Sequence, residues 1–202
     1  MTSVIRDGSG KAFLAKVTQN NRLTTESVVI GAENDAIRIG DGWQITSAPV
    51  VFTAATQSAI LYVKNTDPSR ALILDRAVLI LGSATGAGAG ADWTFRTIRN
   101  PEASGTLVTN AVAAGVSNSN HGSVKAPDAD VFRGVQGDTV DLGGLGSGAP
   151  LPIQQASNRT VFPLGRRLEL GSSIAWQLTP PTGTTAATAV LVGHFYYDTS
   201  GL

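Results

Sequence analysis

The chain has 202 residues, enough for one large β domain or two small ones, and its 42% hydrophobic content can supply a core. Fifteen Lys and Arg residues balance fifteen Asp and Glu residues, so no net field favours binding to nucleic acid or to an anionic membrane. Because there is no cysteine, disulfides, a thiol nucleophile and a zinc-thiolate site are excluded. Charged residues make up only 15% of the chain, against roughly 25% in an average soluble domain. We therefore expect other subunits to cover much of the surface.

The N-terminal region consists of turn sequences separated by very short apolar segments. The stretches RDGSGK, TQNNRL, GAENDA and IGDGW recur between segments that are too short to form a core. We predict an extended N-terminal β arm over residues 1–45 and a body over residues 46–202. Short strands are expected at 25–31 and 36–39, and no segment sustains an amphipathic helix for three turns. No apolar run reaches the length of a signal peptide or a membrane span, so we expect no membrane partner.

The body shows the patterns of β-strands. SAILYVKN (58–65) and TFRTIRN (94–100) alternate apolar and polar residues at period two, which is typical of half-buried strands. In the first of them, Ile60 and Tyr62 are expected on one face and Leu61 and Val63 on the other. Two more continuously apolar segments, 71–81 and 187–198, suit central strands. Their period alone also fits a buried helix, but the flanking Pro, Ser and Gly favour strands. Further strands are expected at 49–55, 106–114, 160–163, 167–170 and 173–178. This pattern predicts an all-β fold, a jelly-roll-like antiparallel β-sandwich.

Two long Gly-rich stretches interrupt the strands, at 82–92 and 134–152, and are expected to be functional, mobile or ordered by a neighbour. Gly86, Gly88 and Gly90 do not form a phosphate loop, because no Gly-Lys-Ser/Thr ending and no helix follows them. We interpret them as a strand connection and expect no cofactor.

The residues that usually carry catalysis are not arranged for it. His121 lies in a polar loop and His194 in an apolar strand, and neither has an acid at the spacing of a triad or metal site. The aspartates that cluster in the second half do not follow the order of an EF-hand, so turns are favoured and calcium binding is a minor alternative. They are Asp128, Asp130, Asp138 and Asp141. We expect no enzymatic activity and no metal site.

Large aromatic side chains dominate cores and interfaces. Trp176, in SIAWQLT, is expected in the core. Trp43, which falls inside the predicted arm, is expected to anchor an interface.

The stretch IRDGSGKAFLAKVTQNNRL (5–23), followed by LYVKN (61–65), resembles a family of accessory virion proteins of tailed bacteriophages. Members of that family begin with an Ile-Arg-Asp-Gly-x-Gly-Lys ladder and an Asn-Arg-Leu turn. The resemblance is clearest from Ile5 to Asn65 and continues more loosely through TIRNP (97–101) and LGSSIAWQLTP (170–180).

The resemblance implies an accessory component of the virion. From the predicted architecture, a β-sandwich body with an arm, we expect a capsid decoration or cement protein on the virion surface that binds the major capsid protein and is assembled in the host cytoplasm. The surface poor in charge favours a homotrimer. One alternative is an adaptor in the tail, neck or baseplate. Another is a carbohydrate-binding module for host adhesion, for which Tyr196 and Tyr197 are the candidate aromatic platform.

In this interpretation the arm adds strands to the exposed edge of a neighbouring subunit. Asp7, Gly8, Asn20 and Asn21 would form its turns. The residues expected to contact the partner are Ile5, Arg6, Phe13, Leu14, Val17, Arg22, Leu23 and Trp43.

Overall fold

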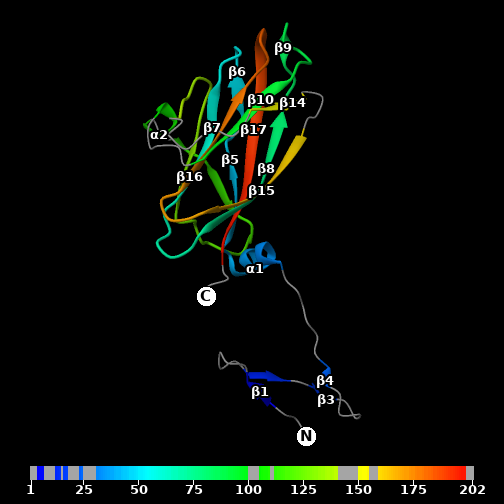
Figure 1. Cartoon of the computed structure of the whole chain (residues 1–202), viewed down its shortest axis with the longest axis vertical. Coiled ribbons are helices and arrows are strands. Elements are labelled where there is room, and N and C mark those ends of the chain that lie inside the picture. Colours follow the sequence, from blue (N-terminus) through cyan, green and yellow to red (C-terminus); the bar gives the residue numbers. More distant parts are fainter. Residues whose placement is uncertain are drawn as a thin grey trace. The chain divides into compact units, whose positions relative to one another are not determined.

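A computed structural model shows an all-β protein with two antiparallel sheets (Figure 1). It describes residues 31–99, 105–109, 112–140, 150–154 and 159–198, and the backbone of four short strands nearer the N-terminus. The chain divides into two compact units, residues 1–31 and residues 32–202. The sequence pattern predicts the boundary at residue 45, whereas the structure places it at residue 31.

The N-terminal unit contains two small antiparallel hairpins. Strand β1 (Val4–Arg6) pairs with β2 (Ala12–Leu14), and β3 (Lys16–Val17) pairs with β4 (Leu23–Thr24). The residues predicted to form the turns lie outside the described residues, as does the strand predicted at 25–31 apart from Gly31. Each described strand of this unit pairs only with its hairpin partner, so these four strands leave their other edges unpaired among the described residues.

A helix opens the body, where a strand was predicted at 36–39. Helix α1 (Ala32–Ile39) has Glu33 and Asp35 in its first turn and Arg38 in its last, which suits the helix dipole. It ends at Gly40, whose φ of 82° is a conformation that favours glycine. The N–H of Gly40 bonds to the carbonyl of Ile37 at 3.0 Å, and the N–H of Asp41 to that of Ala36 at 2.7 Å. This is a Schellman cap, and it makes the strand prediction wrong.

Six strands form sheet I. In spatial order they are β11 (Val112–Ala113), β13 (Ala129–Arg133), β7 (Ser58–Asn65), β16 (Ser173–Thr179), β10 (Trp93–Arg99) and β14 (Leu151–Ile153).

Sheet II faces it. Its order is β12 (Gly115–Asn118), β5 (Gly42–Thr46), β17 (Thr184–Tyr197), β8 (Leu72–Leu81) and β15 (Arg159–Leu168); β6 (Val50–Phe52) and β9 (Thr85–Gly86) also pair with β17.

The β-sandwich predicted from the sequence is confirmed. The segments predicted at 58–65, 71–81, 94–100, 173–178 and 187–198 all form strands, with ends shifted by a few residues. Strands β7, β8 and β10 pair with β16, β15 and β14 in nested order, whereas β12 and β13 lie in different sheets. The jelly-roll topology stays a prediction.

Some elements differ from the predicted ones. The strand predicted at 106–114 is wrong at its start, where helix α2 (Thr106–Thr109) forms, and only its end includes β11. The two strands predicted at 160–163 and 167–170 are one strand, β15, with an irregularity between Pro163 and Arg166. Gly165, whose φ of 51° is a conformation that favours glycine, lies in this irregularity.

The main core lies between the sheets and is rich in aromatic side chains. Trp176 is fully buried there, as predicted, and Trp93 meets Phe52 edge-on with 5.6 Å between ring centroids. A smaller cluster covers the outer face of sheet I, where Tyr62 stacks on Phe132 at 5.7 Å. The described part of the Gly-rich segment after Gly134 thus contributes to the fold, since its Val140 packs in this cluster.

A bulge in β7 divides its side chains between these two clusters. Leu61 is opposite Trp176, but the next partner pair is Ala59 and Gln177, so Ile60 is the extra residue. Ile60 therefore joins Leu61 in the main core, while Tyr62 packs on the outer face. The prediction that Ile60 and Tyr62 share a face is wrong, because strict alternation fails at a bulge.

Candidate interaction surfaces

Most of the residues predicted to contact a partner lie in the N-terminal hairpins. Ile5 is opposite Phe13 in the register of β1 and β2, and Val17 is opposite Leu23 in that of β3 and β4. Arg6 closes β1 and Leu14 closes β2. Arg22 lies outside the described residues.

Trp43 does not belong to this group. It lies in β5 of the body with 1% of its surface exposed, and its ring meets that of Tyr197 edge-on at 5.2 Å. Its Nε1–H donates to the carbonyl of Lys125 at 3.1 Å. The expectation that Trp43 anchors an interface is therefore wrong. The reason is that β5 enters sheet II between β12 and β17, which the short GWQIT segment does not reveal.

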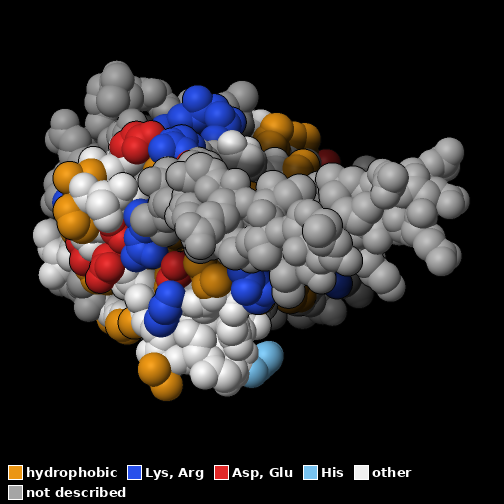
Figure 2. All heavy atoms as spheres, turned by 90° about the horizontal axis from the view of Figure 1, so that it is seen from below, with side chains coloured by type: hydrophobic (Ala, Val, Ile, Leu, Met, Phe, Trp, Pro, Cys, Tyr) orange, Lys and Arg blue, Asp and Glu red, His pale blue; other side chains and the backbone are white. Residues whose placement is uncertain are grey.

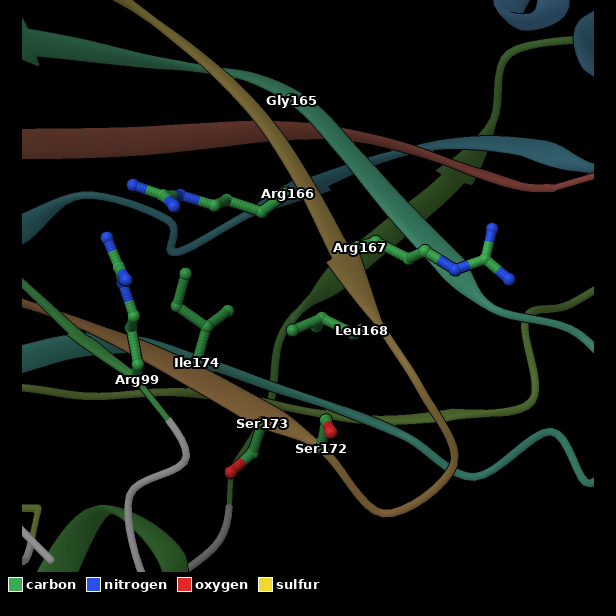
Figure 3. Close-up of a pocket in the computed structure, with 8 residues that line it drawn as sticks. All are labelled: Arg99, Gly165, Arg166, Arg167, Leu168, Ser172, Ser173 and Ile174. Carbon is green, nitrogen blue, oxygen red and sulfur yellow. The ribbon is translucent and has the colours of Figure 1, made fainter. Parts of the chain in front are cut away.

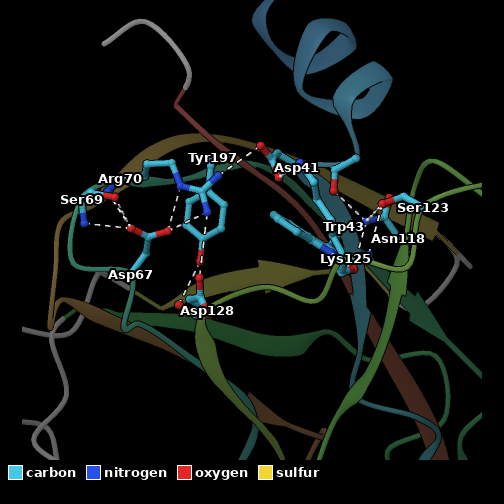
Figure 4. A network of polar contacts seen from close by, with 11 residues as sticks. Asp41, Trp43, Asp67, Ser69, Arg70, Asn118, Ser123, Lys125, Asp128 and Tyr197 are labelled. Carbon is cyan, nitrogen blue, oxygen red and sulfur yellow. Dashed lines mark hydrogen bonds and ion pairs between the residues drawn. The ribbon is translucent and has the colours of Figure 1, made fainter. Parts of the chain in front are cut away.

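The end of the body beside Trp43 carries a network of charged groups (Figure 4). Arg70 forms ion pairs with Asp67 at 2.8 Å and with Asp41 at 3.1 Å, and Lys125 reaches the other oxygen of Asp41 at 3.0 Å. Burial opposes ionisation of Asp67, but hydrogen bonds from Ser69 and Arg70 outweigh it and lower the Asp67 pKa to about 2.

Acidic and basic side chains also lie next to one another on this end of the body in Figure 2, between patches of apolar side chains. Charges that are paired with each other attract little from outside the molecule. The network is therefore a poor candidate for a binding site. Its role is to hold loops against strands within the body.

The proposed glycan platform is not formed. Tyr197 is fully buried, and its hydroxyl donates to the carbonyl of Asp128 at 2.9 Å. Burial raises the pKa of this hydroxyl. Tyr196 points to the other side of β17 and is partly exposed. The two rings therefore cannot bind one sugar together.

The two histidines lie in different parts of the body, His121 in a loop and His194 on β17. His121 is exposed, and the Nδ1 of His194 lies 3.5 Å from the guanidinium of Arg76. Burial and the charge of Arg76 lower the pKa of His194. In the described parts of the chain, no three His, Cys, Asp or Glu residues gather as a metal site would require.

The described aspartates of the alternative calcium site have different places in the fold: Asp130 lies in β13 opposite Lys64, whereas Asp138 serves a turn. The carboxylate of Asp138 accepts bonds from the N–H of Val135 at 2.8 Å and from the hydroxyl of Thr106 at 3.0 Å. Asp141 lies outside the described residues.

The outer face of sheet II presents apolar side chains to solvent. Ile80 on β8 is 41% exposed and Val161 on β15 is 51% exposed. Val190 of β17, which lies opposite Ile80 in the sheet register, is partly exposed, whereas Val78, opposite Val161, is only 4% exposed. A run of apolar side chains across three strands is a surface that subunit contacts commonly cover.

A second surface lies at one side of the sandwich, where β15 of sheet II faces β10 and β14 of sheet I. Two adjoining cavities of about 290 and 310 Å³ open there, and Arg99 and Arg166 line both. We call this pair of cavities the arginine groove. Figure 3 shows the side chains of Arg99 and Arg166 extending to the same side, whereas Arg167 points away. Arg167 instead forms ion pairs with Glu169 and Asp198.

Comparison with known proteins adds no relative: neither a family model nor a curated protein matches this chain. The resemblance to tailed-phage virion proteins therefore stays a prediction drawn from the residues. No helix among the described residues is long and apolar enough to cross a membrane.

Proposed function

We propose that this protein is an accessory structural protein of a tailed-bacteriophage particle, a capsid decoration or cement protein that binds the major capsid protein. The observation that carries the proposal is the division of the chain. A body with its own core is preceded by a separate unit whose described strands pair only as two short hairpins. Strands with unused edges can add to the exposed sheet edge of another subunit.

In this proposal the N-terminal unit supplies affinity through its main chain. Alternate side chains such as Phe13 and Val17 would set the register on the partner strand. The body would contact neighbouring copies in a homotrimer through its apolar outer face, which includes Ile80 and Val161. The low charge content of the chain fits such contacts, because charge is depleted at the centre of interfaces.

The protein would act by mass action and without chemistry. Subunits that bind the assembled lattice, but not its dissociated coat proteins, stabilise the lattice by their binding free energy.

Deletion of residues 1–31 tests the arm. We expect the remaining body to keep its circular dichroism spectrum and cooperative unfolding, because the described core residues all lie within residues 32–202. It should no longer bind purified heads in a sedimentation assay. Normal head binding by the truncated protein would contradict the role of the arm.

Copy number distinguishes the head from the tail. A quantity per virion close to that of the major coat protein supports the lattice role. A quantity lower by an order of magnitude would favour the alternative of an adaptor in the tail, neck or baseplate.

A further inference from the structure

The arginine groove has a feature that packing alone does not explain. Strand pairing places Arg166 opposite Leu74, and Arg99 opposite Ile174, and both partners belong to the main core. The two arginines therefore point inward from opposite sheets, into the same opening between them. Two cations that share one opening repel each other unless an anion lies between them.

The described residues do not supply that anion. Each ion pair formed by a described arginine involves Arg38, Arg70, Arg76 or Arg167. Arg99 and Arg166 are both exposed, so their guanidinium groups are accessible to a ligand. Each can donate two parallel hydrogen bonds to one carboxylate.

One of the two cavities of the arginine groove is largely apolar, because Phe162, Leu164, Leu151 and the buried ring of Phe95 line it. The other cavity has Ser172 and Ser173 in its lining. Phe95 and Phe162 stack at 4.5 Å, which closes the floor between the two sheets. An inorganic anion would leave this apolar part in contact with water, whereas a peptide could fill it with a side chain.

The edges beside the groove suit an extended ligand. β15 is the last strand of sheet II and β14 the last strand of sheet I. The described strands therefore leave one edge of each without a partner, and a peptide lying along the groove could bond to either.

We propose that the arginine groove binds an extended acidic segment of a partner protein, with an apolar side chain on Phe162 and Leu164 and a carboxylate between Arg99 and Arg166. This site goes beyond the role proposed for the arm and does not depend on it. The chain's own arm is a poor occupant, because residues 1–31 contain four basic residues, Arg6, Lys11, Lys16 and Arg22, but two acidic ones, Asp7 and Glu26.

The test uses the full chain and a fluorescent six-residue peptide, Thr-Leu-Asp-Leu-Asp-Thr, whose control has Asn in place of both Asp residues. Binding is followed by fluorescence anisotropy up to millimolar protein. We expect the acidic peptide to bind and the control peptide to bind at least about tenfold more weakly, since charge-assisted hydrogen bonds are lost. Absence of binding by the acidic peptide would overturn the proposal.

Matched variants locate the site. Arg99→Gln and Arg166→Gln should each weaken binding by about tenfold. Arg159→Gln is the control on the same strand, because Arg159 lies opposite the exposed Ile80 on the outer face, and it should bind like the parent. If all three variants lost peptide binding equally, or if none of them lost it, the groove would not be the binding site. Inward-pointing charges also protect sheet edges from aggregation. Self-association of Arg166→Gln together with unchanged peptide binding would show that protection is the only role.

Discussion

The guanidinium of Arg70 lies over the ring of Tyr197, with its Cζ 4.1 Å from the ring centroid. The same group is paired with Asp67 and Asp41, so one side chain joins the loop after β7, the start of β5 and the end of β17. Because Tyr197 also packs on Trp43, the charged network and the aromatic core stabilise each other at this end of the body.

The stability of the protein should depend on Asp67 in acid. Its pKa of about 2 in the folded state lies below that of an unfolded Asp, near 3.9. The stabilisation is therefore complete above the unfolded value and is lost as the pH falls from about 4 through about 2. We expect ionised Asp67 to contribute on the order of 1 to 2 kcal/mol to the free energy of unfolding, a value that allows for solvent screening. Urea unfolding of the parent and of Asp67→Asn between pH 2 and 7 measures this contribution. If the unfolding free energies of the two proteins changed with pH in parallel, Asp67 would not be the source of the acid sensitivity.

Asn65 should be intolerant of an isosteric change. It is fully buried, and its amide NH₂ donates to the carbonyls of Arg70 and Leu168, each at 2.9 Å. In Asn65→Asp both carbonyls would face a carboxylate instead of a donor, at a cost of about 2 to 3 kcal/mol. Thr66→Ala, a change at an exposed neighbour, should stay within about 0.5 kcal/mol. Chemical denaturation of both variants tests this expectation. Similar unfolding midpoints would show that the hydrogen bonds of the Asn65 side chain contribute little to stability.

Trp43 should act on stability and not directly on assembly. Trp43→Ala removes a buried ring and the bond to Lys125, so we expect a loss of about 3 to 5 kcal/mol in the unfolding free energy. Phe13→Ala, in the separate N-terminal unit, should leave the unfolding of the body unchanged while weakening head binding. If Trp43→Ala unfolded like the parent but failed to bind heads, the original assignment of Trp43 as an interface anchor would be restored.

Gly134 should not accept a side chain. A Cβ at this position would lie against the carbonyl oxygen of Ala59, well inside contact distance, while the N–H of Gly134 bonds to the carbonyl of Ile60 at 3.1 Å. Gly134→Ala should therefore cost about 1 to 3 kcal/mol through overpacking. Gly122→Ala is the control, because a Cβ there has only ordinary contacts. Thermal unfolding that treats the two variants alike would mean that the segment shifts freely to make room.

The sequence by itself determined the β-sandwich and its central strands. Period-two alternation in 58–65 and the apolar run in 187–198 are local signals, and a strand needs no more than those to be identified. Helix α1 was missed because eight residues give a weak periodic signal, although Gly40 could have marked its end.

Only the tertiary structure decided which side chains share a surface. The bulge that turns Ile60 into the core depends on how β7 meets β16, and the burial of Trp43 depends on where β5 enters sheet II. Arg99 and Arg166 are far apart in the chain, and the packing of one sheet on the other brings them to one opening. Local patterns report the conformation of a segment, whereas a binding surface arises from segments that meet only after the chain has folded.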